Sequence, residues 1–165
     1  MKNNFEDLAK FMQEMEKKYP EIVEQETEDV MWLIVNLLES AVIDGTPAGV
    51  GGAAGLRGSI FGEVVTIGSG IRGIIGTPVE YAEVVELGRR PGKQPPPGAL
   101  LSWVEKKLGY SSTEAKSIEY LISRKIGKKG TAGKFMFKNA WEKSSDQVYA
   151  LLNTIPDRVR RKIGA

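Results

Sequence analysis

Few residues in this 165-residue chain could carry out catalysis, because it contains no His and no Cys. Histidine is the usual general base near neutral pH, and cysteine supplies thiolate nucleophiles and zinc ligands. Carboxylates remain, and Glu80, Glu83 and Glu86 follow at three-residue steps that place them on one helical face. Glycosidase-type catalysis needs two carboxylates across a cleft, which nothing in the sequence indicates. We therefore expect no enzymatic activity, no cofactor and no bound metal.

Two glycine-rich strings resemble phosphate-binding loops but lack the context that such loops require. Gly68-Ser-Gly-Ile-Arg-Gly73 has dinucleotide-binding spacing, yet that motif needs a helix at its last glycine, and the sequence runs instead toward Pro78. Gly127-Lys-Lys-Gly-Thr-Ala-Gly-Lys134 has Phe135 where a Ser or Thr would have to meet magnesium. We interpret the first string as turn glycines and the second as a basic turn between helices.

The elements that must position any functional residue can be predicted from the spacing of apolar residues. We expect two helices over about 4–19 and 20–43, hairpin strands over 60–67 and 71–76, a short helix within 78–87, and three helices over about 100–108, 111–126 and 134–155. Helices and strands are segregated along the chain rather than alternating. This order predicts an α+β fold, in which a small antiparallel sheet built on a hairpin is packed by N-terminal and C-terminal helices.

The length predicts a single domain over residues 1–165. Its expected parts are N-terminal helices (1–45), a flexible glycine-rich loop (44–58), the hairpin with its short helix (59–88), a basic proline-rich loop (89–97) and C-terminal helices (98–165). The glycine-rich loop has six glycines in 15 residues, which disfavours regular structure. The richest apolar stretch, Val30–Val42, is too short to span a bilayer, so we expect no membrane contact.

Charge is divided unevenly along the chain. Residues 1–45 carry eleven Asp and Glu against four Lys, a balance of −7, and the other 120 residues carry 19 Lys and Arg against ten acids, a balance of +9. A basic body is one property of nucleic-acid-binding proteins, but no aromatic residues alternate with the basic ones as in stacking platforms. We favour subunits that meet head to tail through faces of opposite charge. A small basic DNA-binding module of a mobile element is the alternative.

Several short motifs, in this order, resemble the tail-component family of long-tailed bacteriophages. They are Pro47, Gly55-Leu-Arg-Gly-Ser-Ile60, Ile75-Gly-Thr77, Tyr81-Ala-Glu-Val-Val-Glu-Leu-Gly88, Trp103-Val104, Ile126-Gly-Lys-Lys-Gly-Thr131, Phe135-Met136 and Ala140. The resemblance covers roughly residues 30 to 155. The chain departs from the family pattern at Ala54 and Arg89, where the family usually has Thr, and in the glycine run 49–52, which looks like an insertion.

The resemblance implies a structural virion protein of the phage neck or tail. Such a protein completes the tail, or joins the head connector to the tail, as a homo-oligomeric ring that is sixfold by analogy with tails. The implied partners are other copies of the chain, the head connector or head-completion protein, and the tail terminator or tail tube protein. DNA would pass through the ring without sequence-specific binding. The implied location is the virion, and the host cytoplasm during assembly.

Eight residues are predicted to lie at interfaces with other subunits or partners. They are Gly49, Gly51, Gly52, Arg57, Glu86, Arg89, Arg90 and Lys93. We expect the glycine-rich and proline-rich loops that hold most of them to project from the sheet toward neighbours. We also expect Leu56 to enter the core and Tyr81 to pack with Val85 on the sheet. Two alternatives stay open for Arg57 and Glu86: they pair with each other, within a subunit or across the ring, or both are solvated surface charges worth under about 1 kcal/mol.

Overall fold

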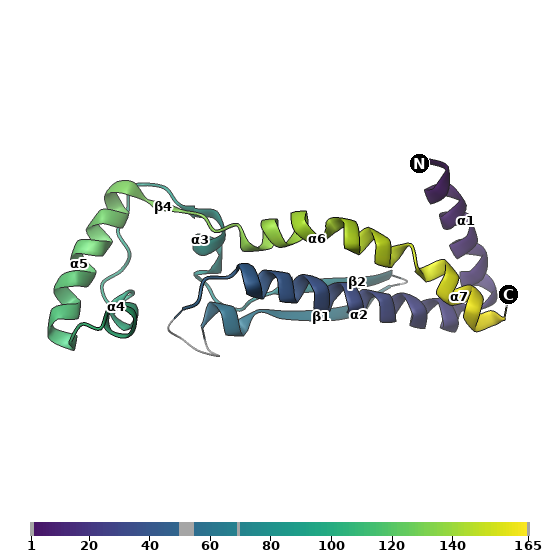
Figure 1. Cartoon of the computed structure of the whole chain (residues 1–165), viewed down its shortest axis with the longest axis horizontal. Coiled ribbons are helices and arrows are strands. Elements are labelled where there is room, and N and C mark those ends of the chain that lie inside the picture. Colours follow the sequence, from purple (N-terminus) through teal and green to yellow (C-terminus); the bar gives the residue numbers. More distant parts are fainter. Residues whose placement is uncertain (1, 50–54, 69, 165) are drawn as a thin grey trace. The chain divides into compact units, whose positions relative to one another are not determined.

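The computed structural model of the chain describes residues 2–49, 55–68 and 70–164 and confirms the α+β class (Figure 1). The helices are α1 (Lys2–Lys18), α2 (Pro20–Gly45), the 3-10 helix η2 (Leu56–Ser59), α3 (Ala82–Leu87), α4 (Leu101–Leu108), α5 (Ser112–Lys129), α6 (Met136–Leu152) and α7 (Ile155–Ile163). The strands are β1 (Phe61–Ile67), β2 (Gly70–Gly76), β3 (Gly88–Arg89) and β4 (Thr131–Ala132). β1 pairs with β2, and β3 with β4, each time antiparallel.

Contacts along the chain divide it into two compact units. Unit 1 comprises residues 1–41, 61–76 and 140–165, and unit 2 comprises residues 42–60 and 77–139. Unit 1 thus holds the β1–β2 hairpin with the helices of both chain ends. Unit 2 holds the middle of the chain with the β3–β4 ladder. A single domain over residues 1–165 stays a prediction.

The core of unit 1 forms between α2, the hairpin and the last two helices. Its fully buried side chains include Val30 of α2 and Val159 of α7, with Val148 of α6 nearly so. Ile75 of the hairpin packs against the same cluster. The apolar residues of α2 recur every three or four positions, which gives the helix one continuous face for this core.

Two glycines allow the hairpin to lie close against α2. Gly62 of β1 and Gly73 of β2 both face Val35, and a Cβ atom at Gly73 would stand only 2.6 Å from a Val35 methyl group. Val35 is fully buried. The hairpin strands are close to those expected from the β-branched runs, with Gly68 in the left-handed conformation (φ 62°) at the turn.

The predicted long C-terminal helix is in fact two helices, and this expectation was wrong. α6 ends at Leu152, and α7 begins at Ile155 with Pro156 in its first turn. A proline has no N–H for the helical ladder, and its ring collides with the carbonyl four residues earlier, here that of Leu152. At the break the Leu151 carbonyl accepts two hydrogen bonds from Thr154, one from its backbone N–H at 2.9 Å and one from its hydroxyl at 2.7 Å.

Unit 2 contains a second ladder that was not predicted. β3 and β4 pair over two residues each, Gly88 opposite Ala132 and Arg89 opposite Thr131. Gly88 and Gly130 have φ values of 77° and 70°, and an added Cβ atom at either would collide with the opposite backbone. Strands of two residues carry no periodic pattern, so the sequence offered no signal for them.

The predicted glycine-rich loop over 44–58 is shorter in the structure, because residues at both of its ends lie in helices. Asp44 and Gly45 belong to α2, while η2 places Leu56 in the core, as expected. The Ser59 and Thr77 hydroxyl groups are 2.7 Å apart and connect η2 to the segment after β2. Residues 50–54 lie outside the described part of the chain.

Candidate functional site

Arg57 and Glu86 do not pair with each other within the chain, so this part of the prediction was wrong. The Arg57 guanidinium lies 3.6 Å from the Asp44 carboxylate, and both side chains are exposed. Glu86 instead accepts hydrogen bonds from the backbone N–H groups of Phe137 and Lys138, each at 3.1 Å. The first N–H groups of a helix have no partner inside it and carry partial positive charge, which explains why a carboxylate is held at the start of α6.

The basic loop is fastened to α5 rather than projecting freely. The Gly92 N–H donates to the Gly127 carbonyl at 2.7 Å, and the Gln94 side chain occupies the space where Gly127 would have a Cβ atom. Arg89 is half-buried in β3, while Arg90 and Lys93 are exposed. Their contact with a neighbouring subunit remains a prediction.

Of the three predicted interface glycines, only Gly49 lies in the described part of the chain. It is exposed, and a Cβ atom there would meet nothing within 4 Å. Gly51 and Gly52 fall outside the described residues. Gly49 is thus available to a partner but is not required for packing within unit 2.

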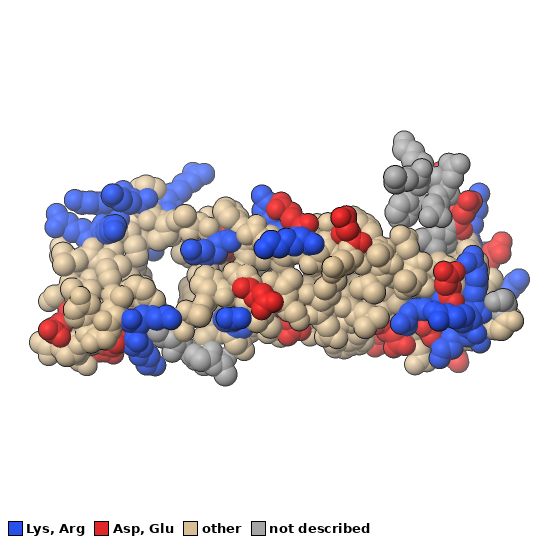
Figure 2. Space-filling model, in the orientation of Figure 1, with Lys and Arg blue, Asp and Glu red and all other residues tan. Residues whose placement is uncertain are grey.

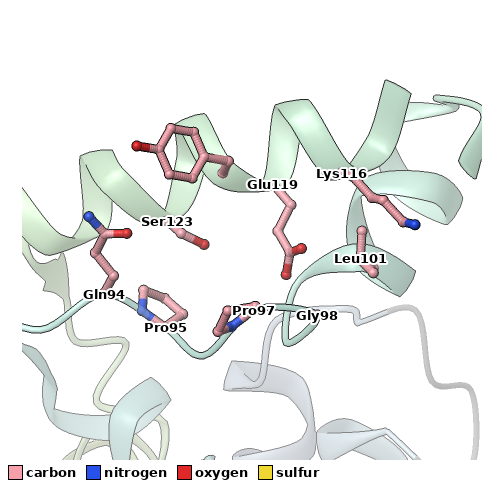
Figure 3. A pocket seen from close by; sticks show the side chains of 9 residues that line it. Gln94, Pro95, Pro97, Gly98, Leu101, Lys116, Glu119 and Ser123 are labelled. Atoms are coloured by element: carbon pink, nitrogen blue, oxygen red, sulfur yellow. The ribbon is translucent and has the colours of Figure 1, made fainter. Parts of the chain in front are cut away.

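A pocket of about 330 Å³ opens in unit 2 between the proline-rich segment and α5 (Figure 3). The Glu119 carboxylate, 6% exposed, accepts a hydrogen bond from the Leu100 N–H at 2.9 Å. This contact satisfies a free donor beside the start of α4. The buried hydroxyl of Ser123 also lines the pocket and has no hydrogen-bond partner among the described residues. Glu119 thus stabilises the junction of α4 and α5.

A basic cluster covers the C-terminal half of α5. Arg124, Lys125, Lys128 and Lys129 surround a shallow hollow beside Leu121. Figure 2 shows Lys and Arg side chains gathered over this part of the helix. Arg124 and Lys128 are four residues apart, as are Lys125 and Lys129, so each pair lies together on the helix surface, and all four line the same hollow. Such a surface suits an acidic protein face or a phosphate backbone.

No group of three acidic side chains in residues 2–49, 55–68 and 70–164 is placed to hold a metal ion. The hydroxyl and N–H of Ser111 both donate to Glu114 and lower the pKa of this carboxyl. These contacts confirm the predicted capping box at the start of α5.

No described helix combines the length and apolar character needed to cross a membrane.

The hairpin has an uncovered apolar face, which we call the outer sheet face. Paired residues of an antiparallel ladder project to the same side. Because Gly62 and Gly73 face α2, the register places Phe61, Glu63, Val65, Ile67, Arg72 and Ile74 on the opposite side. Phe61 is 42% and Ile67 52% exposed. An antiparallel sheet with one face in water normally carries polar residues there. Four of the six residues named on this face are apolar, with Glu63 and Arg72 as the exceptions, so it is a candidate contact surface.

A second apolar surface, which we call the α3 ridge, lies on unit 2. It consists of Tyr81, Val84 and Leu87, which are 54%, 43% and 61% exposed and follow at three-residue steps. Tyr81 precedes α3 and is exposed, and its packing with Val85 on the sheet stays a prediction. The short helix turns Ala82 inward.

These two surfaces were missed when the sequence was considered alone. A signal was present in β1. Phe61, Val65 and Ile67 are apolar residues on one face of this strand, and the apolar Val64 lies on the other face with Gly62. A strand that is apolar on both faces requires cover on both. In the α3 segment the three-residue spacing of Tyr81, Val84 and Leu87 was visible in the sequence. Which face of this helix stays exposed, however, depends on the packing of the rest of unit 2.

Comparisons with known proteins identify no relative for this chain. No family model matches it, and neither the curated proteins nor the solved structures include a significant match.

Proposed function

We propose that this protein is a structural component of a bacteriophage neck or tail. In this role it completes the tail, or joins the head connector to the tail, as a ring of subunits. The assignment to a phage is supported by the ordered motifs over residues 30–155. The assembly role is supported by one structural observation: two units of opposite charge, each with an exposed apolar surface.

The charge division persists in the compact units, although it is smaller there than between residues 1–45 and the rest of the chain. Unit 1 carries 14 Asp and Glu against ten Lys and Arg, a balance of −4, and unit 2 carries seven acids against 13 bases, a balance of +6. Opposite charges on two surfaces of one subunit favour contact between unlike surfaces of neighbours. Repeated contacts of this kind form a ring when the rotation between neighbours closes.

The proposed partners follow from the position of such a ring. They are other copies of the chain, the head connector or head-completion protein on one side, and the tail terminator or tail tube protein on the other. DNA would pass through the ring without sequence-specific contacts. The protein would reside in the virion, and in the host cytoplasm during assembly.

A deletion in the encoding phage tests this function. We expect DNA-filled heads and unattached tails to accumulate, because the joining step is lost, with infectious titre reduced by orders of magnitude. Electron microscopy of lysates and plaque counts measure both effects, and wild-type protein supplied from a plasmid is the control that restores joined particles. Normally joined, infectious particles from the deletion would contradict the proposal.

The basic cluster on α5 supports a second candidate, a small DNA-binding module. A gel shift on non-specific duplex DNA at increasing salt separates the two candidates. The neck function predicts weak binding at physiological salt. Tight binding with a log–log salt slope of several units, lost when Arg124, Lys125, Lys128 and Lys129 are changed to Gln, would favour the DNA-binding module instead.

A further inference from the structure

The outer sheet face and the α3 ridge are two exposed apolar surfaces in the described part of the chain. We propose that the outer sheet face of one copy receives the α3 ridge of the next copy. The proposal rests on the proposed assembly role and names the surfaces that make the contact. Its partner is a second copy of this chain, and the contact joins unit 1 of one copy to unit 2 of another.

The two surfaces match in their apolar side chains. The outer sheet face presents Phe61 and Ile67 at its two ends, with Val65 and Ile74 half-buried between them. The ridge presents Tyr81, Val84 and Leu87 as a single row. A sheet face accepts a row of helical side chains along its length, as in any packed sheet and helix layer. Exposed apolar patches bordered by polar residues are typical of protein interfaces.

The charges beside these surfaces are complementary. Arg72 is exposed on the outer sheet face, and Glu80 and Glu83 are exposed beside the ridge. Glu63 is the acidic residue of the sheet face, and Arg90 is exposed just beyond the end of α3. Each charged group on one surface therefore has an opposite charge on the other. Such pairs set orientation and exclude wrong partners.

A contact between two outer sheet faces would explain the exposed apolar surfaces and the complementary charges less well. It would be self-complementary and would close as a dimer, leaving the α3 ridge in water. A contact of sheet face with ridge covers both surfaces in every copy of a ring. It also brings the negative unit 1 against the positive unit 2.

Two variants that each spoil one surface test the contact. Ile67→Glu places a charge on the sheet face, and Leu87→Glu places one on the ridge. We expect each alone to raise the concentration for half-assembly roughly tenfold or more, because a buried charge opposes the contact. Mixed one to one, the variants should form dimers and nothing larger, because only one pair of intact surfaces remains. Thr66→Glu, on the opposite side of β1, is the matched control and should assemble like the wild type.

Sedimentation velocity distinguishes the outcomes. Assembly of Leu87→Glu or of Ile67→Glu at wild-type concentrations would overturn the contact, as would a mixture that stays monomeric. Because all three results concern purified protein, they are independent of the deletion phenotype in the phage. A chain that assembles as described but is absent from virions would refute the neck function and leave the contact intact.

Disulfide trapping captures the contact even where assembly is weak. The chain has no Cys, so Ile67→Cys with Leu87→Cys introduces the only thiol groups. We expect mild oxidation to give a ladder of covalent oligomers from the double variant, and only monomer from either single variant. Efficient dimers from Ile67→Cys alone would show sheet meeting sheet and overturn the proposal. The absence of a ladder at the highest soluble concentration would overturn it as well.

Discussion

At the scale of single residues, Glu86 connects two segments that lie more than 50 residues apart in the sequence. Its two carboxylate oxygens accept N–H groups from residues 51 and 52 positions later, at the start of α6. The adjoining backbone reinforces this junction, because Lys134 and Phe135 donate to the carbonyl groups of Val85 and Glu86. Phe135 has a φ of 52°, in the left-handed region that side chains other than glycine rarely adopt. Four hydrogen bonds thus hold the backbone at the start of α6 against the end of α3.

Loss of the Glu86 carboxylate should destabilise this junction. We expect Glu86→Ala to lower the free energy of unfolding by about 1–2 kcal/mol, since two helix N–H groups lose a charged acceptor. Glu86→Gln should cost less, because its amide oxygen still accepts one bond. Urea unfolding of the full chain measures both, with Glu24→Ala on the exposed side of α2 as the control. Equal losses for Glu86→Ala and Glu24→Ala would contradict this role.

At the scale of elements, the sequence predicted those that repeat a pattern and missed those that do not. The hairpin and the helices ahead of α6 lie close to their predicted positions, because β-branched runs, capping residues and apolar spacing are local signals. The break before Ile155 was missed although Pro156 marks it, because the apolar spacing continues through it. The β3–β4 ladder depends on residues more than 40 positions apart and has no local signal.

The close approach of α2 to the hairpin gives a test at this scale. Gly73→Ala should lower the free energy of unfolding by about 1–3 kcal/mol, because the new methyl group overlaps a Val35 methyl group. Gly70→Ala in the same strand is the matched control, since the nearest atom to its Cβ would be 3.6 Å away. Val35→Ala should remove much of the extra cost in a double-mutant cycle. A Gly73→Ala protein as stable as Gly70→Ala would show that the hairpin does not lie this close.

At the scale of the whole molecule, the charge division could be predicted from the sequence and the contact surfaces could not. Counting acids and bases along the chain requires no structure, and their opposite balance persists in the two compact units. Which apolar residues stay exposed depends on the packing of each unit, so the exposure of Tyr81 was not predicted and Ile67 was not singled out. For the same reason, Arg57 and Glu86 were paired with each other although each has a nearer partner.

The mass of the assembled protein tests the central claim of head-to-tail assembly most directly. Native mass spectrometry or light scattering of the purified chain, over a range of concentrations, measures it without labels. We predict a closed particle whose mass is a ring-sized multiple of the 18.1 kDa chain, sixfold by analogy with phage tails. We also predict that raised salt weakens it, because screening reduces the attraction between the oppositely charged units. A chain that stays monomeric at every concentration, or that stops at a dimer, would contradict this account.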